Sequence, residues 1–518
     1  MPPGSPYPVI LMRSQGTKDW ATVGSGSIRG MWHAEIGFST GRLDRLYVVS
    51  GRELYSVDSA GTATLIGDIG TPNNLDFAHN TDSLVIVNEP RAFHFDGRIA
   101  SGTHDGAGNA AVLQDSTADW LENVFVGLTI SNTTDGSKGR ITANTQTTIT
   151  ATLEGGTDND WDASDAYSLN SFGEILDPDF TSRGAGNVEF LENFLLFREP
   201  NSNRFFGADL GEVTDYDALN FANADSNPDN MIGMITDHRS LVVFGKETTE
   251  LFENTGVSGF PFERNINGTM QVGLSAENLY GRCFDVVYFI ADDLTVRRLD
   301  GVAPIRVSTH YIEQKLESFT LSTGEAFSYW QEGHFFMGFS FFEGTIVYDA
   351  MTQEWHERAS FNLDYWRFRH MQRFAGVTLA GDHDSNEVVE LDLLTYQDAV
   401  TSQHMSSNVH VMEWTYQAIY AEGTKAFHDR LEVRFEAGIG LTTGQGSDPK
   451  MMMEFSDDGG KTWHQLPTRT LGKKGEYEDR AVWHNLGSAR QRVYRGSVSD
   501  PVRVFIGDTV VEVRGGRL

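Results

Sequence analysis

Two acidic stretches have the residue types that bind metal ions. Asp158-Asn159-Asp160-Trp161-Asp162 and Asp382-His383-Asp384-Ser385-Asn386-Glu387 each place several oxygen donors on a short segment. Calcium requires about six to eight oxygen ligands, and loops of this kind supply some of them. Neither stretch has EF-hand spacing, and turns rich in Asp and Asn are common between strands without a metal. We therefore assign no metal-binding residue.

Other chemistry-bearing patterns are incomplete. Gly460-Lys461-Thr462 matches the end of a phosphate-binding P-loop, but Phe455 occupies the position where that motif requires glycine. The following Trp463–Leu466 segment predicts a strand and not a phosphate-binding helix. The histidines are scattered without an H-E-x-x-H motif, and no pair of acids is singled out for glycoside hydrolysis. Cys283, the single cysteine, begins an apolar strand and is expected to be buried. No catalytic or cofactor-binding residue is assigned, and no cofactor is expected.

The sharpest short motif is Ser456-Asp457-Asp458-Gly459-Gly460-Lys461-Thr462-Trp463. It matches S-x-D-x-G-x-T-W, which resembles the Asp-box hairpin of sialidases and other glycan-handling propellers. Ser and Asp side chains can cap a tight turn through backbone amides, glycine supplies positive φ, and the tryptophan packs beneath. One copy outside the blade pattern favours a rigid structural hairpin over a sialidase.

Basic residues alternate along a late strand region: Arg490, Arg492, Arg495 and Arg503. They could meet an acidic partner surface, although a solvated strand face is the commoner explanation for such a pattern.

Composition limits the classes of function. The chain has 518 residues and a net charge of −32, so bulk electrostatics oppose binding to a nucleic-acid backbone. One cysteine excludes a disulfide framework and a cysteine-ligated zinc site. No apolar run is long enough to span a bilayer, and Met1-Pro2-Pro3-Gly4 lacks the pattern of a secretory signal.

Short β-branched and aromatic runs separated by Gly, Asn and Asp predict an all-β chain. A two-strand unit recurs roughly every 40 to 50 residues, the spacing of four-stranded propeller blades. The units are Leu46–Asp58, Ser83–Gly97, Leu241–Glu253, Val286–Gly301, Phe335–Asp349 and Phe374–Asp392. The expected fold is a β-propeller-like platform of six or seven blades. The one helix expected, at Thr309–Ser318, is a connector.

The spacing of the units also predicts the domains. Residues 1–100 and 171–400 form the two parts of the platform, and residues 101–170 form an inserted small β-barrel or β-sandwich. The insert is expected to pair strands from Phe125–Asn132, Ser137–Ala143 and Thr147–Leu153. From about Thr401 the blade pattern stops, and residues 401–518 are expected to form a C-terminal β-sandwich. The insert holds ten acidic and two basic residues, whereas the last segment is balanced at fifteen each, so the platform carries most of the negative charge.

A family resemblance follows from Ile232–Gly256. This stretch resembles the packaged-DNA stabilisation proteins, or tail hub and nozzle proteins, of short-tailed, podovirus-type bacteriophages. The shared pattern falls on Ile232-Gly233, Phe244-Gly245, Glu250, Phe252 and Thr255-Gly256. Further matches are Gln271 and Gly273, Ser308-Thr309 with Ile312-Glu313, and Val347-Tyr348-Asp349-Ala350 before Trp355.

The resemblance implies a structural virion protein and no enzyme. Such proteins form a homo-hexameric ring below the portal and the head-to-tail adaptor. They close the head, retain packaged DNA, anchor tail fibres or tailspikes, and form the conduit for DNA ejection, in some cases with a tail needle or plug. Genomic double-stranded DNA would pass without sequence-specific binding, and an acidic lumen would repel its phosphates. The implied locations are the virion tail and, during assembly, the host cytoplasm. The alternatives are a glycan-binding or sialidase-like propeller and a cellular scaffold propeller.

Overall fold

The computed structural model describes residues 11–37, 42–399, 410–420 and 423–516. The absence of a signal at Met1–Gly4 and the boundary at Thr401 are predictions that lie outside these residues. Strands dominate the described residues, and the helices are the short α1 (Pro178–Thr181), α2 (His310–Leu316) and a 3-10 turn at Leu321–Thr323. No helix in the described ranges is long and apolar enough to cross a membrane.

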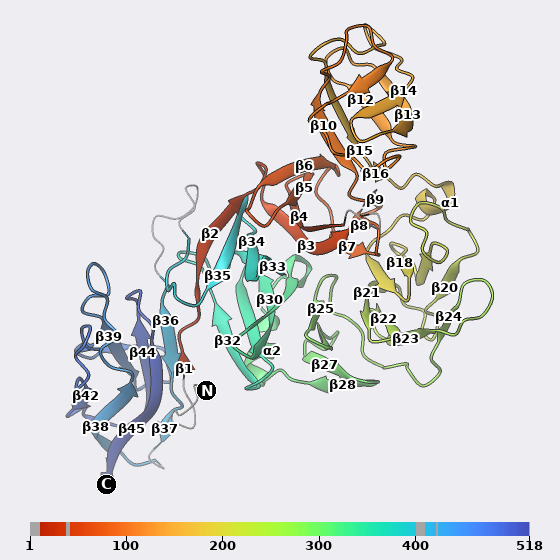
Figure 1. Cartoon of the computed structure of the whole chain (residues 1–518). Helices are drawn as coiled ribbons and strands as arrows, with labels where there is room; N and C mark the ends of the chain where they lie inside the picture. Colours follow the sequence, from red (N-terminus) through yellow and green to blue (C-terminus); the bar gives the residue numbers. More distant parts are fainter. Residues whose placement is uncertain (1–10, 38–41, 400–409, 421–422, 517–518) are drawn as a thin grey trace. The chain divides into compact units, whose positions relative to one another are not determined.

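Seven four-stranded antiparallel sheets form the blades of a propeller in the described chain (Figure 1). Blade 1 consists of β3 (Ile28–Ile36), β4 (Leu43–Ser50), β5 (Glu53–Val57) and β6 (Ala63–Asp68). Blade 2 consists of β7 (Leu75–His79), β8 (Leu84–Asn88), β9 (Arg91–Phe95) and β16 (Gly173–Glu174). Blade 3 consists of β17 (Val188–Leu191), β18 (Phe194–Arg198), β19 (Arg204–Gly207) and β20 (Phe221–Asn223). Blade 4 consists of β21 (Met231–Asp237), β22 (Ser240–Gly245), β23 (Thr249–Asn254) and β24 (Phe262–Arg264). Blade 5 consists of β25 (Tyr280–Cys283), β26 (Val286–Ile290), β27 (Val296–Asp300) and β28 (Ala303–Arg306). Blade 6 consists of β29 (Glu325–Gln331), β30 (His334–Phe341), β31 (Gly344–Asp349) and β32 (Glu354–Arg358). Blade 7 consists of β33 (Phe368–Phe374), β34 (Val377–Asp382), β35 (Glu387–Asp392) and β2 (Gly16–Thr22).

The recurring sequence unit corresponds to the second and third strands of a blade. The second strand is covered on both faces, and β8 and β22 therefore consist mainly of apolar residues. Their side chains form the cores between adjacent blades, as Phe244 of β22 does against Phe289 of β26 at a ring separation of 5.0 Å. This burial explains why these strands give the strongest pattern in the sequence.

Blade 7 is closed by a strand from the other end of the propeller sequence. β2 pairs with β35, and the Val23 amide donates to the Asn386 carbonyl at 2.8 Å. Closure of this kind pairs an edge strand that would otherwise be exposed.

The inserted segment has a core of its own. Its strands pair in the order β10-β15-β12-β13-β14-β11, drawn in orange in Figure 1. They are β10 (Ile99–Thr103), β11 (Val112–Gln114), β12 (Thr129–Asn132), β13 (Lys138–Asn144), β14 (Thr148–Ala151) and β15 (Ala166–Asn170). The predicted strand at Phe125–Asn132 was too long, because Phe125–Leu128 forms a turn in which the Leu128 amide donates to the Phe125 carbonyl.

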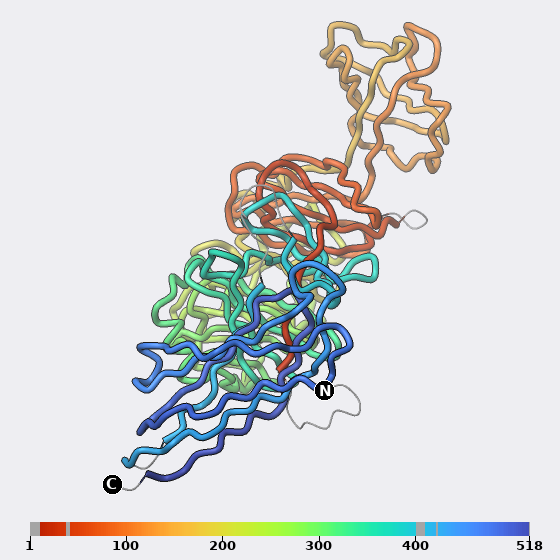
Figure 2. The backbone as a smooth tube through the Cα atoms, turned by 90° about the vertical axis from the view of Figure 1, so that its left-hand side faces the viewer, coloured from red at the N-terminus to blue at the C-terminus, as the bar shows by residue number. Residues whose placement is uncertain are grey.

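The C-terminal strands form two sheets around another core, as a β-sandwich does. One sheet has the order β1-β45-β38-β42, with β43 beside β38, and the other has β36-β44-β39-β40, with β37 beside β44 and β41 beside β39. The long strands of this unit lie side by side in Figure 2. The strands are β1 (Leu11–Met12), β36 (Met412–Thr415), β37 (Ile419–Tyr420), β38 (Ala426–Phe435), β39 (Lys450–Ser456), β40 (His464–Gln465), β41 (Arg469–Thr470), β42 (Ala481–His484), β43 (Ser488–Ala489), β44 (Gln491–Val498) and β45 (Phe505–Gly515).

Candidate functional site

Polar side chains bridge the centre of the propeller. The Asn278 amide, before β25 of blade 5, donates to the Asn74 side-chain oxygen, before β7 of blade 2, at 2.6 Å. Arg198 of blade 3 places Nη2 3.1 Å from the Glu277 carboxylate of blade 5. These contacts join blades that are not neighbours in the ring. The centre is therefore spanned by side chains.

Two carboxylates on the inner strands belong to this network. Asp76 of β7 accepts from the Val188 amide at 2.9 Å, and Glu189 of β17 accepts from the Thr236 hydroxyl at 2.9 Å. Arg282 of β25 donates to the same hydroxyl at 2.6 Å. Hydrogen bonds thus continue from blade 2 to blade 5 along the inner strands.

Desolvation changes the ionisation of these two carboxylates. Burial raises the pKa of Asp76 to about 6. Burial, followed by the nearby charge of Asp76, raises the pKa of Glu189 to about 8. Low dielectric and a second carboxylate both disfavour the charged form. Near neutral pH we therefore expect the pair to retain a proton.

A hollow of about 500 Å³ lies beside this network. Arg198 and Lys246 bring positive charge to its wall, and Glu277 and Asp292 bring negative charge. Arg198 is only 2% exposed, and Gly186 makes room for it, because a Cβ at Gly186 would lie 2.3 Å from Arg198 Nη2. The mixed charges could recognise a polar segment of another molecule.

Residues of the family pattern in blade 4 have structural roles. Glu250 is buried, accepts from the Ser226 hydroxyl at 2.7 Å and lies 3.3 Å from Arg264. Gly233 passes so close to Tyr280 that a Cβ would lie 2.5 Å from the ring. Of the other pattern residues, Phe252 is buried in the core that blade 4 shares with blade 3.

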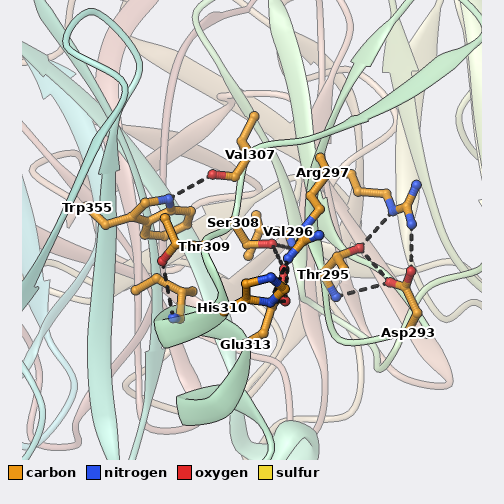
Figure 3. A network of polar contacts seen from close by, with 12 residues as sticks. Asp293, Thr295, Val296, Arg297, Val307, Ser308, Thr309, His310, Glu313 and Trp355 are labelled. Atoms are coloured by element: carbon orange, nitrogen blue, oxygen red, sulfur yellow. Dashed lines mark hydrogen bonds and ion pairs between the residues drawn. The ribbon is translucent and has the colours of Figure 1, made fainter.

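The pattern residues between blades 5 and 6 build the start of α2 (Figure 3). The Thr309 side chain accepts a hydrogen bond from the Ile312 amide and so caps the helix at its first turn. This short helix is the connector predicted at Thr309–Ser318. Ser308 donates to Glu313 at 2.6 Å, and Arg306 holds the same carboxylate in a bidentate pair. Nearby, the Trp355 indole donates to the Val307 carbonyl at 3.0 Å. These residues fix the connector to blades 5 and 6.

The Asp-box side chains are occupied by their own turn. Asp458 accepts from the Lys461 and Thr462 amides, both at 2.9 Å, and Ser456 accepts from the Gly460 amide at 2.8 Å. The hydrogen bonds from the Thr462 hydroxyl, first, and from its amide lower the pKa of Asp458. The motif joins β39 to β40 in the sandwich, where it acts as the rigid hairpin predicted from the sequence.

The two acidic stretches differ. Asp158, Asp160 and Asp162 bring carboxylate oxygens within 4.8 Å of one another in the insert. In the second stretch Asp382 is fully buried in an ion pair with Arg367, and Asp384 accepts from the Tyr365 hydroxyl at 3.0 Å. The second stretch is therefore committed mainly to the turn between β34 and β35.

The late arginines pair within the sandwich. Arg492 is 2% exposed and binds Asp457 through two hydrogen bonds of 2.6 and 2.7 Å, so a solvated strand face was the wrong interpretation for this residue. Arg495 pairs with Glu454, and Arg503 lies 3.3 Å from Glu436.

Cys283 of the propeller is buried, and burial raises its thiol pKa to about 12, as expected for an unreactive core residue.

Sequence reasoning missed two groups. The paired carboxylates Asp76 and Glu189 lie on strands with no local motif. Glu325, His370 and His383 also converge, although only His383 stood in a stretch singled out by composition.

Comparison with known proteins identifies the two main parts of the chain. Residues 136–396 match the family model "Bacteriophage P22 Gp10, beta-propeller", and residues 412–514 match "Bacteriophage P22 Gp10, beta-sandwich". None of the curated proteins compared matches the chain.

Several solved structures share a distant likeness. Raptor from Chaetomium thermophilum has 8% identity and a TM-score of 0.35, covering 74% of this chain and 30% of its own. A chain of the Mitotic Checkpoint Complex has 9% identity and a TM-score of 0.32, covering 74% and 95%. The Dos1 propeller has 8% identity and a TM-score of 0.33, covering 73% and 94%.

The family matches confirm the resemblance that begins at Ile232–Gly256, and they span both the propeller and the sandwich. The chain belongs to the bacteriophage P22 Gp10 family and is a structural protein of a phage tail.

Proposed function

We propose that the chain is the tail hub, or nozzle, which forms a homo-hexameric ring below the portal and adaptor. In this role it closes the head, retains the packaged DNA, anchors fibres or spikes and encloses the ejection conduit. The family membership supports the location in the tail. The finer roles are what the resemblance to tail hub proteins implies, and the fold and its charge support them.

The bridged propeller centre is the observation that carries the proposal. Asn74–Asn278 and Arg198–Glu277 contacts cross the centre between non-neighbouring blades. Double-stranded DNA therefore has no path through a single propeller. If the protein encloses a conduit, that conduit must lie between several copies of the chain. A cyclic ring with heterologous interfaces meets this requirement.

Charge gives a second argument. The chain carries a net charge of −32, whereas residues 401–518 are balanced. A lumen lined by acidic parts of the propeller would repel phosphates, so that DNA would slide without being held. On this basis the protein should not retard duplex DNA in a mobility assay, even at low salt, where attraction to DNA would be strongest.

Mass photometry tests the assembly directly. The purified chain is measured alone and after mixing with portal–adaptor complexes, with the adaptor-free portal as the control. We expect six copies to add to each adaptor-bearing complex and none to the control. A chain that remains monomeric and ignores the adaptor would refute the hub. Turnover of a fluorogenic sialoside would then favour the glycan-active alternative.

Fibre attachment is a separable part of the proposal. The inserted strands fold around their own core, so a variant in which a short Gly-Ser linker replaces residues 101–170 should still form the ring. We propose that this variant loses binding to the fibre or spike protein. Retained fibre binding would exclude the insert as the anchor while leaving the ring proposal intact.

A further inference from the structure

Three side chains with metal-binding atoms converge where blades 6 and 7 meet. Glu325 begins β29, His370 lies in β33, and His383 follows β34. A carboxylate oxygen and one nitrogen from each ring all lie within 4.8 Å of one another. The two inner strands, β29 and β33, are in contact, so the group links adjacent blades.

The spacing of two of these atoms suits a shared cation. His370 Nε2 lies 3.6 Å from Glu325 Oε2, which is too long for a hydrogen bond. Both atoms are shielded from solvent and accept or donate no hydrogen bond among the described residues, and Glu325 Oε2 forms an ion pair with Arg369. Two ligands on a tetrahedral Zn²⁺ with bonds near 2.1 Å are about 3.4 Å apart. A cation between them would satisfy the His370 nitrogen, which is otherwise costly to leave unpaired.

A β-bulge sets the orientation of His370. The register between β33 and β34 shifts between Arg369 and Gln372, and His370 has a φ of +54°. Left-handed backbone is uncommon for a residue other than glycine, and bulges redirect side chains from the regular strand alternation. The local backbone thus departs from a regular strand at the residue that faces Glu325.

Arg369 is the main charge opposed to a cation at this position. Its Nη1 lies 3.2 Å from Glu325 Oε2, and its side chain is 1% exposed. Oε2 is also the oxygen that lies 3.6 Å from His370 Nε2, so a metal bound to Oε2 requires the guanidinium to pair with the other carboxylate oxygen, as hydrogen-bonded ligands commonly do. Asp384 is a further negative charge near His383 and partly offsets Arg369.

We propose that Glu325, His370 and His383 bind one divalent transition-metal ion that joins blade 6 to blade 7. Two imidazoles and a carboxylate suit Zn²⁺ and related ions better than Ca²⁺ or Mg²⁺, which prefer oxygen ligands alone. The ion would stabilise the propeller beside its closing blade. This binding is independent of the proposed role in the tail.

Zinc titration of the full chain tests the proposal. The protein, without a polyhistidine tag and stripped of metal, carries Asp160→Asn throughout so that the carboxylates of the insert do not contribute. Isothermal titration calorimetry with Zn²⁺ should give a stoichiometry of one ion per chain. Co²⁺ bound in place of Zn²⁺ should give visible absorption bands typical of a low coordination number. His383→Asn and Glu325→Gln should each weaken Zn²⁺ binding at least about tenfold.

His334→Asn is the matched control, because His334 is 30% exposed in blade 6 and lies outside the cluster. It should retain wild-type affinity. Zinc should also raise the melting temperature of the parent protein but not of His383→Asn, with the variant's circular dichroism in metal-free buffer checking its fold. Absence of a zinc site in the parent, or equal binding by the parent and His383→Asn, would overturn the proposal.

Discussion

Replacing Glu189 with glutamine should make the propeller less sensitive to alkaline pH. The folded pKa of Glu189 is about 8, well above the ordinary value of 4.5, because of burial first and the charge of Asp76 second. The folded state therefore binds more protons than the unfolded state across this range, and its stability falls as pH rises from about 4.5 to 8. At about 1.4 kcal/mol per pKa unit, the full shift corresponds to an upper bound of ~5 kcal/mol. Because the side chain is half-buried and water screens part of the effect, we expect about 2 to 3 kcal/mol.

Urea unfolding followed by tryptophan fluorescence at pH 5.5, 7 and 8.5 measures this effect. The wild type should lose about 1 to 2 kcal/mol more than Glu189→Gln between the first and last pH, since pH 5.5 already lies above the unfolded pKa and the amide cannot ionise. Glu263→Gln, at an exposed position on β24, is the matched control and should follow the wild type. Parallel pH profiles for the wild type and Glu189→Gln would refute the reasoning.

Three further predictions concern stability. Gly273→Ala places a Cβ 2.2 Å from a neighbouring backbone carbonyl and should lower the free energy of unfolding in urea by about 1 to 3 kcal/mol. Gly281→Ala is the control and should lower it little, because its Cβ meets a flexible methionine methyl at 3.1 Å. Equal losses of stability in the two variants would contradict the packing argument. Ser456→Ala removes the turn bonds of a fully buried hydroxyl and should lower sandwich stability by about 1 to 2 kcal/mol without changing ring assembly; an unchanged melting temperature would count against it. Burial lowers the pKa of His356 to about 3, so the stability of the wild type should fall as pH drops below about 6.5. His356→Gln should therefore unfold at a lower pH than the wild type in an acid titration. Identical acid midpoints of the two proteins would exclude this contribution.

The sequence predicted those parts of the fold that are buried on both faces. Second strands such as Leu241–Gly245 are apolar throughout, so their repetition revealed the blades. The blade count was left open between six and seven because the six recurring units do not include blade 3 and because two blades have a fourth strand that lies far away in the sequence. The fourth strand of blade 2, Gly173–Glu174, comes after the whole insert, and the fourth strand of blade 7, Gly16–Thr22, comes before blade 1. Neither strand has a pattern of its own that assigns it to a blade.

The site residues were harder to predict because each depends on contacts between distant strands. Asp76 and Glu189 are separated by the insert, and neither belongs to a motif. His370 faces Glu325 at a β-bulge, which no single sequence pattern predicts. In a chain with many acids and fifteen histidines, only the fold selects which of them meet.

The positions of β1 and β2 have a consequence for how the chain is made. β2 completes blade 7 with β35, and β1 pairs with β45 in the sandwich, so the first strands of the chain wait for partners that are synthesised several hundred residues later. At roughly 5 to 20 residues per second, the ribosome needs about 20 to 70 s to reach β35 after β2. During that interval the early blades form a ring that cannot close, with two unpaired edges exposed to other nascent chains. Translation itself therefore delays the closed propeller until the chain has been made as far as Asp392, and a product truncated before that point would carry an open edge instead of a finished propeller.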